Sequence, residues 1–336
     1  MSGHRGRVLG GRKWLFGNLP LLIFLAVLIA VLASPLYSST SPTSFTAFGA
    51  LQNFASLGLL ALAVGLSMMV KEFDLSTIGV YTVGGLVAVK FGGDSAFLGV
   101  LLALLAGTFV GLFQGSVIAK TGISSVPLTL GGFLTLLGVS YLLANGGTLP
   151  YENYSAGLWL DSPIATIFSA RSLIVLAVFL IVGLVFAWTR IGPEVRAVGG
   201  DRRAASAAGV PAGWVLIGIF TFSGFCSALG GALFAFSTSA AASDLGLSPF
   251  IFAITAALLG GVALAGGRGT AAGIFLGVLT LSLLEGLFAQ LGTPAYVVDL
   301  VRGGLLVAVV LVEAPDLRRQ IARIRTQLSK HAGPEF

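Results

Sequence analysis

Ten apolar stretches, separated by short segments that carry most of the charge, repeat along this chain. A helix needs about 20 apolar residues to cross the hydrocarbon core of a bilayer, within a range of about 17–25. The chain is 56% hydrophobic and only 10% charged, whereas a soluble globular domain is about 25% charged. We therefore predict an all-α integral membrane protein with about ten transmembrane helices, surrounded by membrane lipid. The predicted spans are 19–37, 53–70, 76–91, 96–118, 126–144, 172–189, 214–236, 250–265, 271–290 and 295–312.

The Lys and Arg residues gather in the segments between these stretches. Cytoplasmic loops of membrane proteins carry an excess of both cations. With the N-terminus in the cytoplasm and the spans alternating, only Lys90 and Arg171 fall outside, and Arg302 falls within a span. An odd number of spans would separate the two basic tails, so we predict an even number, with both termini cytoplasmic. The cations predicted inside are Arg5, Arg7, Arg12, Lys13, Lys71, Lys120, Arg190, Arg196, Arg202, Arg203, Arg268, Arg318, Arg319, Arg323, Arg325 and Lys330.

The sequence lacks the residue sets on which several enzyme classes depend. Its single cysteine, Cys226, allows neither an internal disulfide nor a Cys-based metal site, and His4 and His331 lie in the tails. There is no G-x-x-x-x-G-K-[ST] phosphate loop; residues 266–270 come nearest to one. The net charge of +6 arises in tails and loops rather than on an aromatic-bearing surface, which argues against nucleic-acid binding. We expect no catalytic residue, metal or cofactor on this chain.

Three regions are predicted along the chain. Residues 1–18 form a basic cytoplasmic tail, residues 19–313 the membrane domain, and residues 314–336 a second basic cytoplasmic tail. A basic segment before an apolar stretch is also how a signal peptide begins. The first stretch is long for a signal peptide, and its removal would leave nine spans, so we predict an uncleaved first helix.

Three segments outside the spans differ in composition. Residues 38–50 are uncharged, rich in Ser and Thr, and predicted external. Residues 145–171 form a longer external loop with aromatic and acidic side chains, which either contacts another protein or rests at the membrane interface. Residues 190–213 are predicted cytoplasmic and carry six charges.

Residues 84–113 and 260–288 share a pattern of glycine and apolar residues. Their offset corresponds to five spans, and because five is odd the second copy is inverted in the membrane. Inverted repeats recur in transporters, where the substrate route lies near the midplane between the halves. We therefore predict two inverted five-helix halves; the alternative is a chance similarity of two helices rich in Gly, Ala and Leu.

Ionisable groups within the predicted spans are few. Glu285 lies in the ninth span, and Asp299 and Arg302 lie three residues apart in the tenth. Residues at this spacing share a helix face, so we expect a local pair near the outer interface, with a proton relay as the alternative. Ion-coupled transport usually needs buried charge, and its scarcity indicates that the driving energy comes from elsewhere.

Four segments, in this order along the chain, resemble one family. Residues 73–76 (Phe-Asp-Leu-Ser), 145–146 (Asn-Gly), 198–210 and 258–269 are similar to marked segments of monosaccharide permeases of the ribose-transporter type. These are membrane subunits of ATP-binding-cassette importers, and the resemblance covers residues 50–313. Residues 201–203 are more charged than is common in the family, which is expected to alter pairing with the ATPase. Thr77-Ile78-Gly79 stands where Val-Gly-Ser is usual.

The resemblance implies a set of partners and a cellular location. It implies a type II importer fold in a bacterial inner membrane and a dimer with a second permease copy or a homologue. It also implies a cytoplasmic ATPase that binds the ATP and Mg²⁺, and an external solute-binding protein that delivers a monosaccharide or similar small polar solute. The alternatives are a permease for branched-chain amino acids or nucleosides, and an ion-coupled secondary transporter working alone.

Two groups of candidate site residues follow. In residues 190–213, Asp201 is placed to cap a short helix over 202–208 after a break at Gly199–Gly200, with Gly209 and Pro211 ending it. Such a helix suits docking into an ATPase; an ordinary basic loop is the alternative. The candidate coupling residues are Glu194, Gly199, Gly200, Asp201, Ala207 and Gly209. The candidate substrate-path residues, all polar, are Asn53, Asp74, Ser76, Gln114 and Asn145, with helix capping as the alternative for Asp74 and Ser76.

Overall fold

The computed structural model describes residues 19–32, 43–93 and 95–311, and it is predominantly helical. The predicted tails, residues 33–42 and Asp94 lie outside the described residues. The elements are α2 (Leu19–Leu32), α4 (Thr43–Met69), α5 (Ser76–Phe91), α6 (Ala96–Thr121), α7 (Ser125–Ala144), β1 (Thr148–Pro150), α8 (Tyr154–Asp161), α9 (Ala170–Trp188), α10 (Ile191–Gly200), α11 (Arg202–Ala207), α12 (Ala212–Ser237), β2 (Ala240–Ala242), α13 (Ser248–Leu259) and α14 (Ala271–Gln290). Residues 295–311 are also helical.

Among the described residues, six helices are long and apolar enough to cross a membrane: α4, α6, α7, α9, α12 and α14. The apolar helices α2, α5 and α13 are shorter. Helices dominate because lipid offers no hydrogen-bond partner to the backbone, and a helix satisfies its own N–H and C=O groups.

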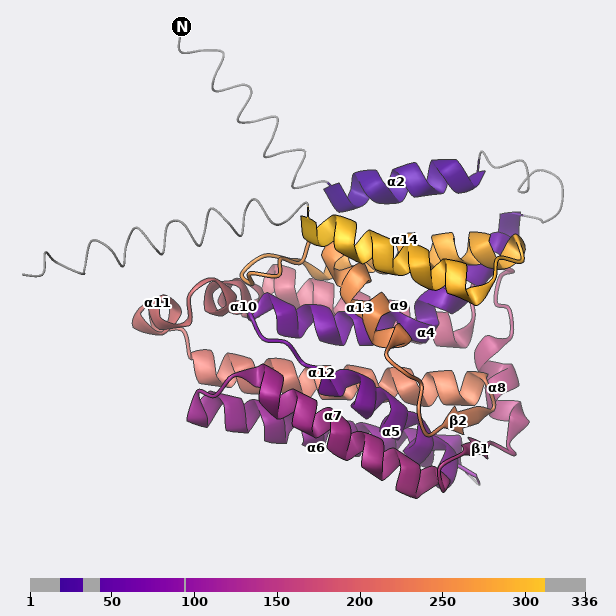
Figure 1. Ribbon diagram of the computed structural model, residues 1–336, viewed down its shortest axis with the longest axis horizontal. Helices are drawn as coiled ribbons and strands as arrows, with labels where there is room; N and C mark the ends of the chain where they lie inside the picture. Colours follow the sequence, from indigo (N-terminus) through magenta and orange to yellow (C-terminus); the bar gives the residue numbers. More distant parts are fainter. Residues whose placement is uncertain (1–18, 33–42, 94, 312–336) are drawn as a thin grey trace, which may run out of the picture.

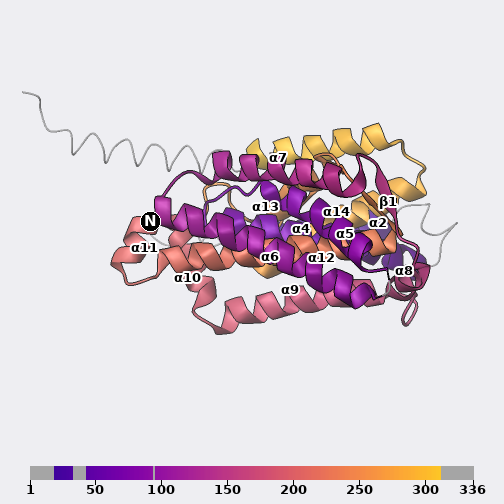
Figure 2. The ribbon, with the colours of Figure 1, turned by 90° about the horizontal axis from the view of Figure 1, so that it is seen from below.

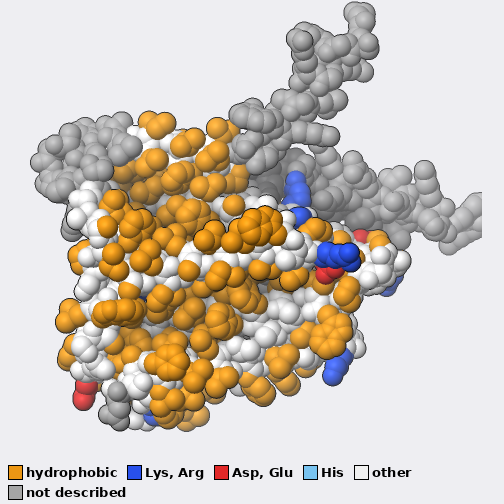
Figure 3. Space-filling view, turned by 180° about the vertical axis from the view of Figure 1, so that it is seen from behind, with side chains coloured by type: hydrophobic (Ala, Val, Ile, Leu, Met, Phe, Trp, Pro, Cys, Tyr) orange, Lys and Arg blue, Asp and Glu red, His pale blue; other side chains and the backbone are white. Residues whose placement is uncertain are grey.

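Hydrophobic side chains cover the outside of the bundle. Figure 3 shows them across most of one face, with Lys and Arg gathered toward one end. Phe97, Leu142 and Trp188 are each more than three-quarters exposed. Soluble proteins rarely expose apolar patches of more than a few hundred Å², so this surface is covered by lipid or by other membrane helices.

Two helices, α4 and α12, form the interior of the bundle. α12 packs against α4, α5 and α6, while α4 packs against α9, α13 and α14. In Figure 1, α5, α6 and α7 lie on one side of α12, and α2, α13 and α14 lie beyond α4. Figure 2 shows α9 along the edge of the bundle opposite α7.

The contact between α12 and α6 depends on glycine. A Cβ atom on Gly224 of α12 would lie 2.1 Å from the carbonyl oxygen of Gly107 in α6, well inside the distance that real atoms tolerate. Small residues at such positions let the backbones of membrane helices approach closely, and van der Waals attraction between the closely packed atoms then stabilises the contact.

Loops that are distant in sequence meet at the two ends of the bundle. At one end, Gly267 N–H donates to the carbonyl oxygen of Met69 (3.0 Å), and Arg202 pairs with Glu72. Lys71 and Arg268 lie in these loops and Arg202 begins α11, and we call this the basic end. At the opposite end, β1 and β2 pair antiparallel, with Leu149 opposite Ala241.

Each predicted span overlaps a helix, but several boundaries were wrong. The predicted external segment 38–50 is helical from Thr43 onward, because α4 begins ten residues before the predicted start at Asn53. The Ser and Thr residues that suggested a loop are compatible with the first turns of a long helix. Gly199 and Gly200 do not break the chain, since both belong to the last turn of α10 and the break follows at Asp201.

The two similar segments, 84–113 and 260–288, have partly different local structures. α6 begins at Ala96 and α14 at Ala271, which are corresponding places in the repeat. However, α5 continues as a helix through Gly84 and Gly85, whereas α13 ends at Leu259 and a loop follows.

We predict that Gly224→Ala weakens the bundle because the added methyl group meets the backbone of α6. Overpacking of this kind costs about 1–3 kcal/mol. The measurement is the temperature at which the detergent-solubilised protein aggregates. Gly213→Ala, on the same helix, is the matched control, since its Cβ would lie 3.9 Å from the Cβ of Ala119. Equal aggregation temperatures for the two variants would contradict this prediction.

Candidate functional site

α10 and α11 project from the basic end as two short consecutive helices (Figure 1). Asp201 lies between them in an extended conformation and caps α11: its carboxylate accepts hydrogen bonds from the backbone N–H groups of Arg203 (2.9 Å) and Ala204 (3.0 Å). The hydrogen bond from Ala204, with smaller contributions from Arg203 and Lys71, lowers the pKa of Asp201. The cap therefore stays ionised and intact at neutral pH and is lost only on acidification. The predicted capping role of Asp201 is confirmed.

Gly209 ends α11 in a left-handed conformation, with φ of +87°. Its N–H donates to the carbonyl oxygen of Ser206, and Val210 N–H donates to that of Ala205, both at 3.0 Å. This is the Schellman arrangement that terminates helices. α11 is therefore fixed at both ends, and the predicted termination at Gly209 is confirmed.

The outer side of α11 consists mainly of small exposed residues. Ala205 is buried against the bundle, while Ala204, Ser206, Ala207 and Ala208 are exposed. Gly200 is also exposed, and a Cβ there would meet nothing within 4 Å. A rigid projection with short side chains allows another protein to approach the backbone closely.

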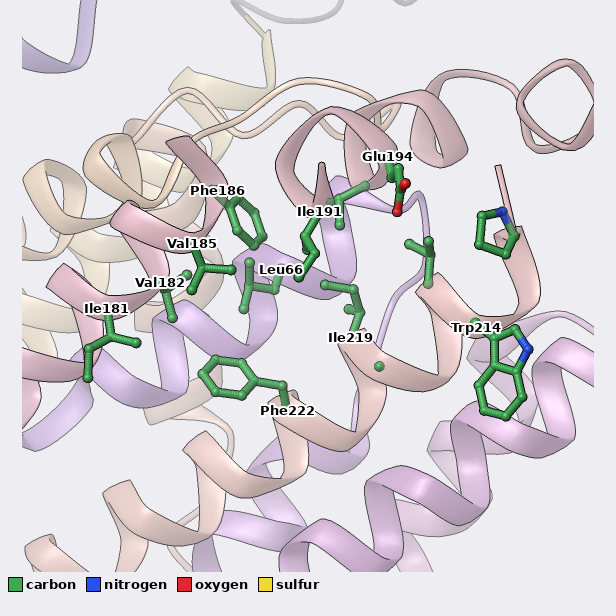
Figure 4. A pocket seen from close by; sticks show the side chains of 14 residues that line it. Leu66, Ile181, Val182, Val185, Phe186, Ile191, Glu194, Trp214, Ile219 and Phe222 are labelled. Carbon is green, nitrogen blue, oxygen red and sulfur yellow. The ribbon is translucent and has the colours of Figure 1, made fainter. Parts of the chain in front are cut away.

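Two predicted coupling residues have other surroundings. Gly199 is buried, and a Cβ on it would lie 1.8 Å from the carbonyl oxygen of Met69, so it lets α10 rest on the end of α4. Glu194 lies one helix away from α11 and lines an apolar pocket between α9 and α12. In Figure 4 its carboxylate is directed toward that pocket.

Three of the predicted path residues meet in the interior of the chain. Ser76 Oγ lies 2.6 Å from Asp74 Oδ1 and 2.9 Å from Gln114 Oε1, and all three residues are buried. A hydroxyl group has one hydrogen, so when it donates to Asp74 the Gln114 amide must turn its nitrogen toward Ser76. Asp74 also accepts from Ser76 N–H at 3.0 Å. Asp74 therefore holds the first N–H of α5 from one position before the N-cap, which is Leu75 and makes no side-chain cap.

The segment carrying Asp74 turns back inside the bundle. Gln114, which bonds to Ser76, lies seven residues before the end of α6. At 1.5 Å per residue, the segment therefore reaches about 10 Å along α6 from that end. Ser125 and Thr129 of α7 hold the segment, since their hydroxyls accept from the N–H groups of Phe73 (3.1 Å) and Leu75 (3.2 Å). The chain thus re-enters the bundle before α5 begins.

The other two predicted path residues lie elsewhere. Asn53 is partly buried on α4, where its side-chain nitrogen would lie 3.9 Å from a Cβ placed on Gly286 of α14. Asn145 is exposed and ends α7 in a left-handed conformation. Neither joins Asp74, Ser76 and Gln114.

At the opposite end, a buried arginine joins several helices. Arg171 is 4% exposed, in the first turn of α9, and not in the external loop where the sequence placed it. Its guanidinium donates to Asp161 of α8 (2.8 Å) and to Ser56 (2.9 Å) and Gln52 (2.7 Å) of α4. Ser237 of α12 donates to the same Asp161. Removing one partner of a fully buried pair costs about 3–5 kcal/mol, and the cost here is smaller because the Asp161 side chain is 30% exposed.

The segment 145–171, predicted as an external loop, is more ordered than the sequence suggested. It contains β1 and α8. Tyr151 is buried, its hydroxyl donates to the carbonyl oxygen of Gly92 (2.9 Å), and its ring stacks on Phe236. Tyr154 and Trp159 of α8 are both mostly exposed. Of the loop's aromatic residues, these two are the most exposed to a partner or to lipid, while Phe168 is partly buried.

A second, partly buried arginine lies in the C-terminal helix. Asp299 and Arg302 share a face as predicted, with a separation of 3.2 Å. Arg302 also pairs with Glu285 of α14, a contact that the sequence did not predict. The sequence did carry a signal for this pair, because Glu285 and Arg302 are opposite charges in two consecutive apolar helices.

Long lipid-facing helices with their charges paired or confined to the two ends define this chain as a multi-pass integral membrane protein. Residues 46–310 match the family described as the permease component of branched-chain amino acid transport systems, and the chain belongs to that family. Permease components are not themselves enzymes. This one is a multi-pass inner-membrane subunit, and the family implies a partner ATPase and a solute-binding protein.

Curated relatives match along nearly their whole length. The L-arabinose ABC transporter permease AraH of Azospirillum brasilense is 28% identical over 91% of this chain and 90% of its own. The ribose import permease RbsC of Escherichia coli K12 is 30% identical over 87% and 92%. The autoinducer 2 import permease LsrC of Enterobacter sp. strain 638 is 31% identical over 95% and 91%. The predicted resemblance to ribose-type permeases is confirmed. No solved structure matches the chain.

We predict that Gln114→Ala destabilises the segment that turns back before α5. The change leaves the buried Ser76 hydroxyl with one partner fewer, which costs about 1–3 kcal/mol. The detergent-solubilised variant should aggregate at a lower temperature than the wild type. Thr135→Ala, on exposed α7 surface where the hydroxyl bonds only its own helix, should leave that temperature unchanged. Equal behaviour of the two variants would count against a stabilising role for this cluster.

Proposed function

We propose that this chain forms the translocation path for a monosaccharide, or a similar small polar solute, as the permease subunit of an ATP-binding-cassette importer. The observation that carries the proposal is the whole-length similarity to permeases named for L-arabinose, ribose and autoinducer 2. The short helix that projects from the basic end supports it, because a subunit driven by a separate ATPase needs such a contact.

The proposed topology has ten membrane crossings, in two inverted halves, with both termini in the cytoplasm. Residues 1–18 and 314–336 are its basic tails. The meeting of loops 70–75, 190–211 and 260–270 at one end supports this arrangement. Their cations then lie on the cytoplasmic side, as the positive-inside rule requires.

The proposed complex contains two permease chains, either identical or homologous, surrounded by lipid. ATP and Mg²⁺ bind to the partner ATPase, and this chain holds no cofactor. The solute-binding protein docks at the end opposite the basic end. The exposed rings of Tyr154 and Trp159 on α8 support a contact there, since aromatic residues are enriched at protein interfaces.

Coupling to the ATPase is assigned to α11 and the residues around it. The cap at Asp201 and the left-handed turn at Gly209 fix both ends of this helix. The small exposed residues Gly200 and Ala207 let the ATPase approach its backbone. Arg202 connects it to Glu72, two residues before Asp74. A force on α11 therefore reaches the segment that carries Asp74 and Ser76 through one ion pair.

Asp74, Ser76 and Gln114 are proposed to contact the solute when that segment moves. Carboxylate, hydroxyl and amide groups are the partners that sugar hydroxyls require. In the described conformation these groups bond to one another, so transport requires that solute hydroxyls replace those bonds.

A second candidate solute is a branched-chain amino acid. The description of the matching family favours it, whereas the names of the relatives favour a sugar. Uptake of labelled ribose, arabinose and leucine into vesicles that contain the complete transporter distinguishes the two. An ion-coupled transporter working alone would instead move solute without ATP and respond to an ion gradient.

The proposed function is tested by isolating the chain from its native membrane in mild detergent. We expect a stoichiometric ATPase with it, and ATP-dependent uptake of a monosaccharide after reconstitution of the complex. A second permease sequence in the preparation would identify a heterodimer. Recovery of the chain alone at every detergent strength, with uptake driven by an ion gradient, would overturn the proposal.

We predict that Ala207→Trp uncouples ATP hydrolysis from uptake, because the large ring separates α11 from the ATPase. Uptake by reconstituted vesicles should fall at least about tenfold, which corresponds to about 1.4 kcal/mol of lost interaction. ATP hydrolysis should lose its dependence on the solute-loaded binding protein. Ala197→Trp, at an exposed position of α10, is the matched control. Unchanged uptake by the Ala207 variant would refute the docking role of α11.

A further inference from the structure

An apolar pocket of about 380 Å³ lies between α9 and α12, closed by α4 on the inside and by α10 at the basic end. Its size is within the range of small-ligand pockets, about 300–1,000 Å³. The lining includes Leu66, Val182, Phe186, Ile219 and Phe222, and Glu194 is its one ionisable group (Figure 4).

The rim of this pocket faces the surface that lipid covers. Ile181 of α9 and Trp214 of α12 line it and are 58% and 74% exposed. Trp188, at the end of α9, is 81% exposed. Tryptophan is enriched where a membrane helix leaves the hydrocarbon for the headgroups. The pocket therefore opens at the depth where a phospholipid changes from acyl chain to headgroup.

Glu194 lines the pocket at its basic end, and Arg190 lies just outside the lining. Glu194 has no ion-pair partner among the residues that the structure describes. Arg190 is exposed and precedes it by four residues. Residues four apart lie on one face of a helix, so a carboxylate and a guanidinium are presented together above an apolar pocket.

We propose that this pocket binds one phosphatidylethanolamine molecule from the leaflet at the basic end. One of its two acyl chains occupies the apolar pocket, the ammonium group pairs with Glu194, and the phosphate pairs with Arg190. Phosphatidylglycerol carries the same phosphate but lacks the ammonium, so its headgroup leaves Glu194 without an ion-pair partner. The bound lipid fills the space between α10 and the helices α9 and α12, and so supports the base of α11.

Gly218 offers a way to fill the pocket without disturbing the fold. It lines the pocket, and a Cβ on it would meet nothing within 4 Å. Gly183 on α9 also has nothing within 4 Å of its Cβ and lies outside the pocket lining. Gly218→Leu and Gly183→Leu are thus a matched pair, of which only the first occupies the lipid site.

The test is native mass spectrometry of the full-length permease released from nanodiscs that contain equal amounts of phosphatidylethanolamine and phosphatidylglycerol. We expect one retained phosphatidylethanolamine per chain in the wild type and in Gly183→Leu, and its loss in Gly218→Leu. Glu194→Gln should lower the ratio of retained phosphatidylethanolamine to phosphatidylglycerol about tenfold, the equivalent of one charged hydrogen bond. Equal retention by both leucine variants, or equal retention of the two lipids by the wild type, overturns the proposal.

A second measurement does not depend on a pocket-filling variant. With Trp14, Trp159 and Trp188 replaced by Phe, Trp214 at the rim is the remaining tryptophan. Phosphatidylethanolamine brominated on its acyl chain should quench its fluorescence at a lower mole fraction than brominated phosphatidylglycerol. Identical quenching curves for the two lipids would contradict a site selective for phosphatidylethanolamine.

Discussion

Close backbone contact between α12 and its neighbours is the interaction on which the rest of the structure depends. Lipid is as apolar as the helices it surrounds, so burial of apolar side chains does not by itself hold membrane helices together. Glycines at the contact of α12 with α6, such as Gly224 and Gly107, supply the short distances that dispersion attraction requires. α12 follows directly after α11 at the basic end, and at its other end Ser237 reaches Asp161. One helix thus connects both ends of the molecule.

The charged residues at or near membrane depth are held by partners from other helices. Arg171 connects α4, α8 and α9, and Arg302 connects its own helix to α14. An unpaired charge in this environment is costly, and removal of one partner leaves the other uncompensated. These arginines therefore act as cross-links that specify which helices lie together, a role that apolar contacts with similar neighbours perform poorly.

The basic end combines three features within one small region. α11 presents a rigid surface of short side chains, Glu72 connects it to the segment that carries Asp74, and the apolar pocket lies beneath α10. Movement of α10 and α11 as one body would change all three together. The arrangement places the proposed ATPase contact, the proposed solute contacts and the proposed lipid within reach of one another.

The sequence by itself determined the class of protein, the approximate positions of the helices, and the local structure of α11. These follow from hydropathy and from caps such as Asp201 and Gly209, which act between residues close together in the chain. It also brought Asp74 and Ser76 together, since they are two residues apart. Only the tertiary structure joined Gln114 to them, placed Asn53 and Asn145 apart from these three residues, and placed Glu194 in the lining of an apolar pocket. Arg171 and Gln52 are 119 residues apart, and Arg202 and Glu72 are 130 apart. Such pairs depend on which helix faces lie against each other, and that is decided by packing across the whole bundle, which local patterns do not encode.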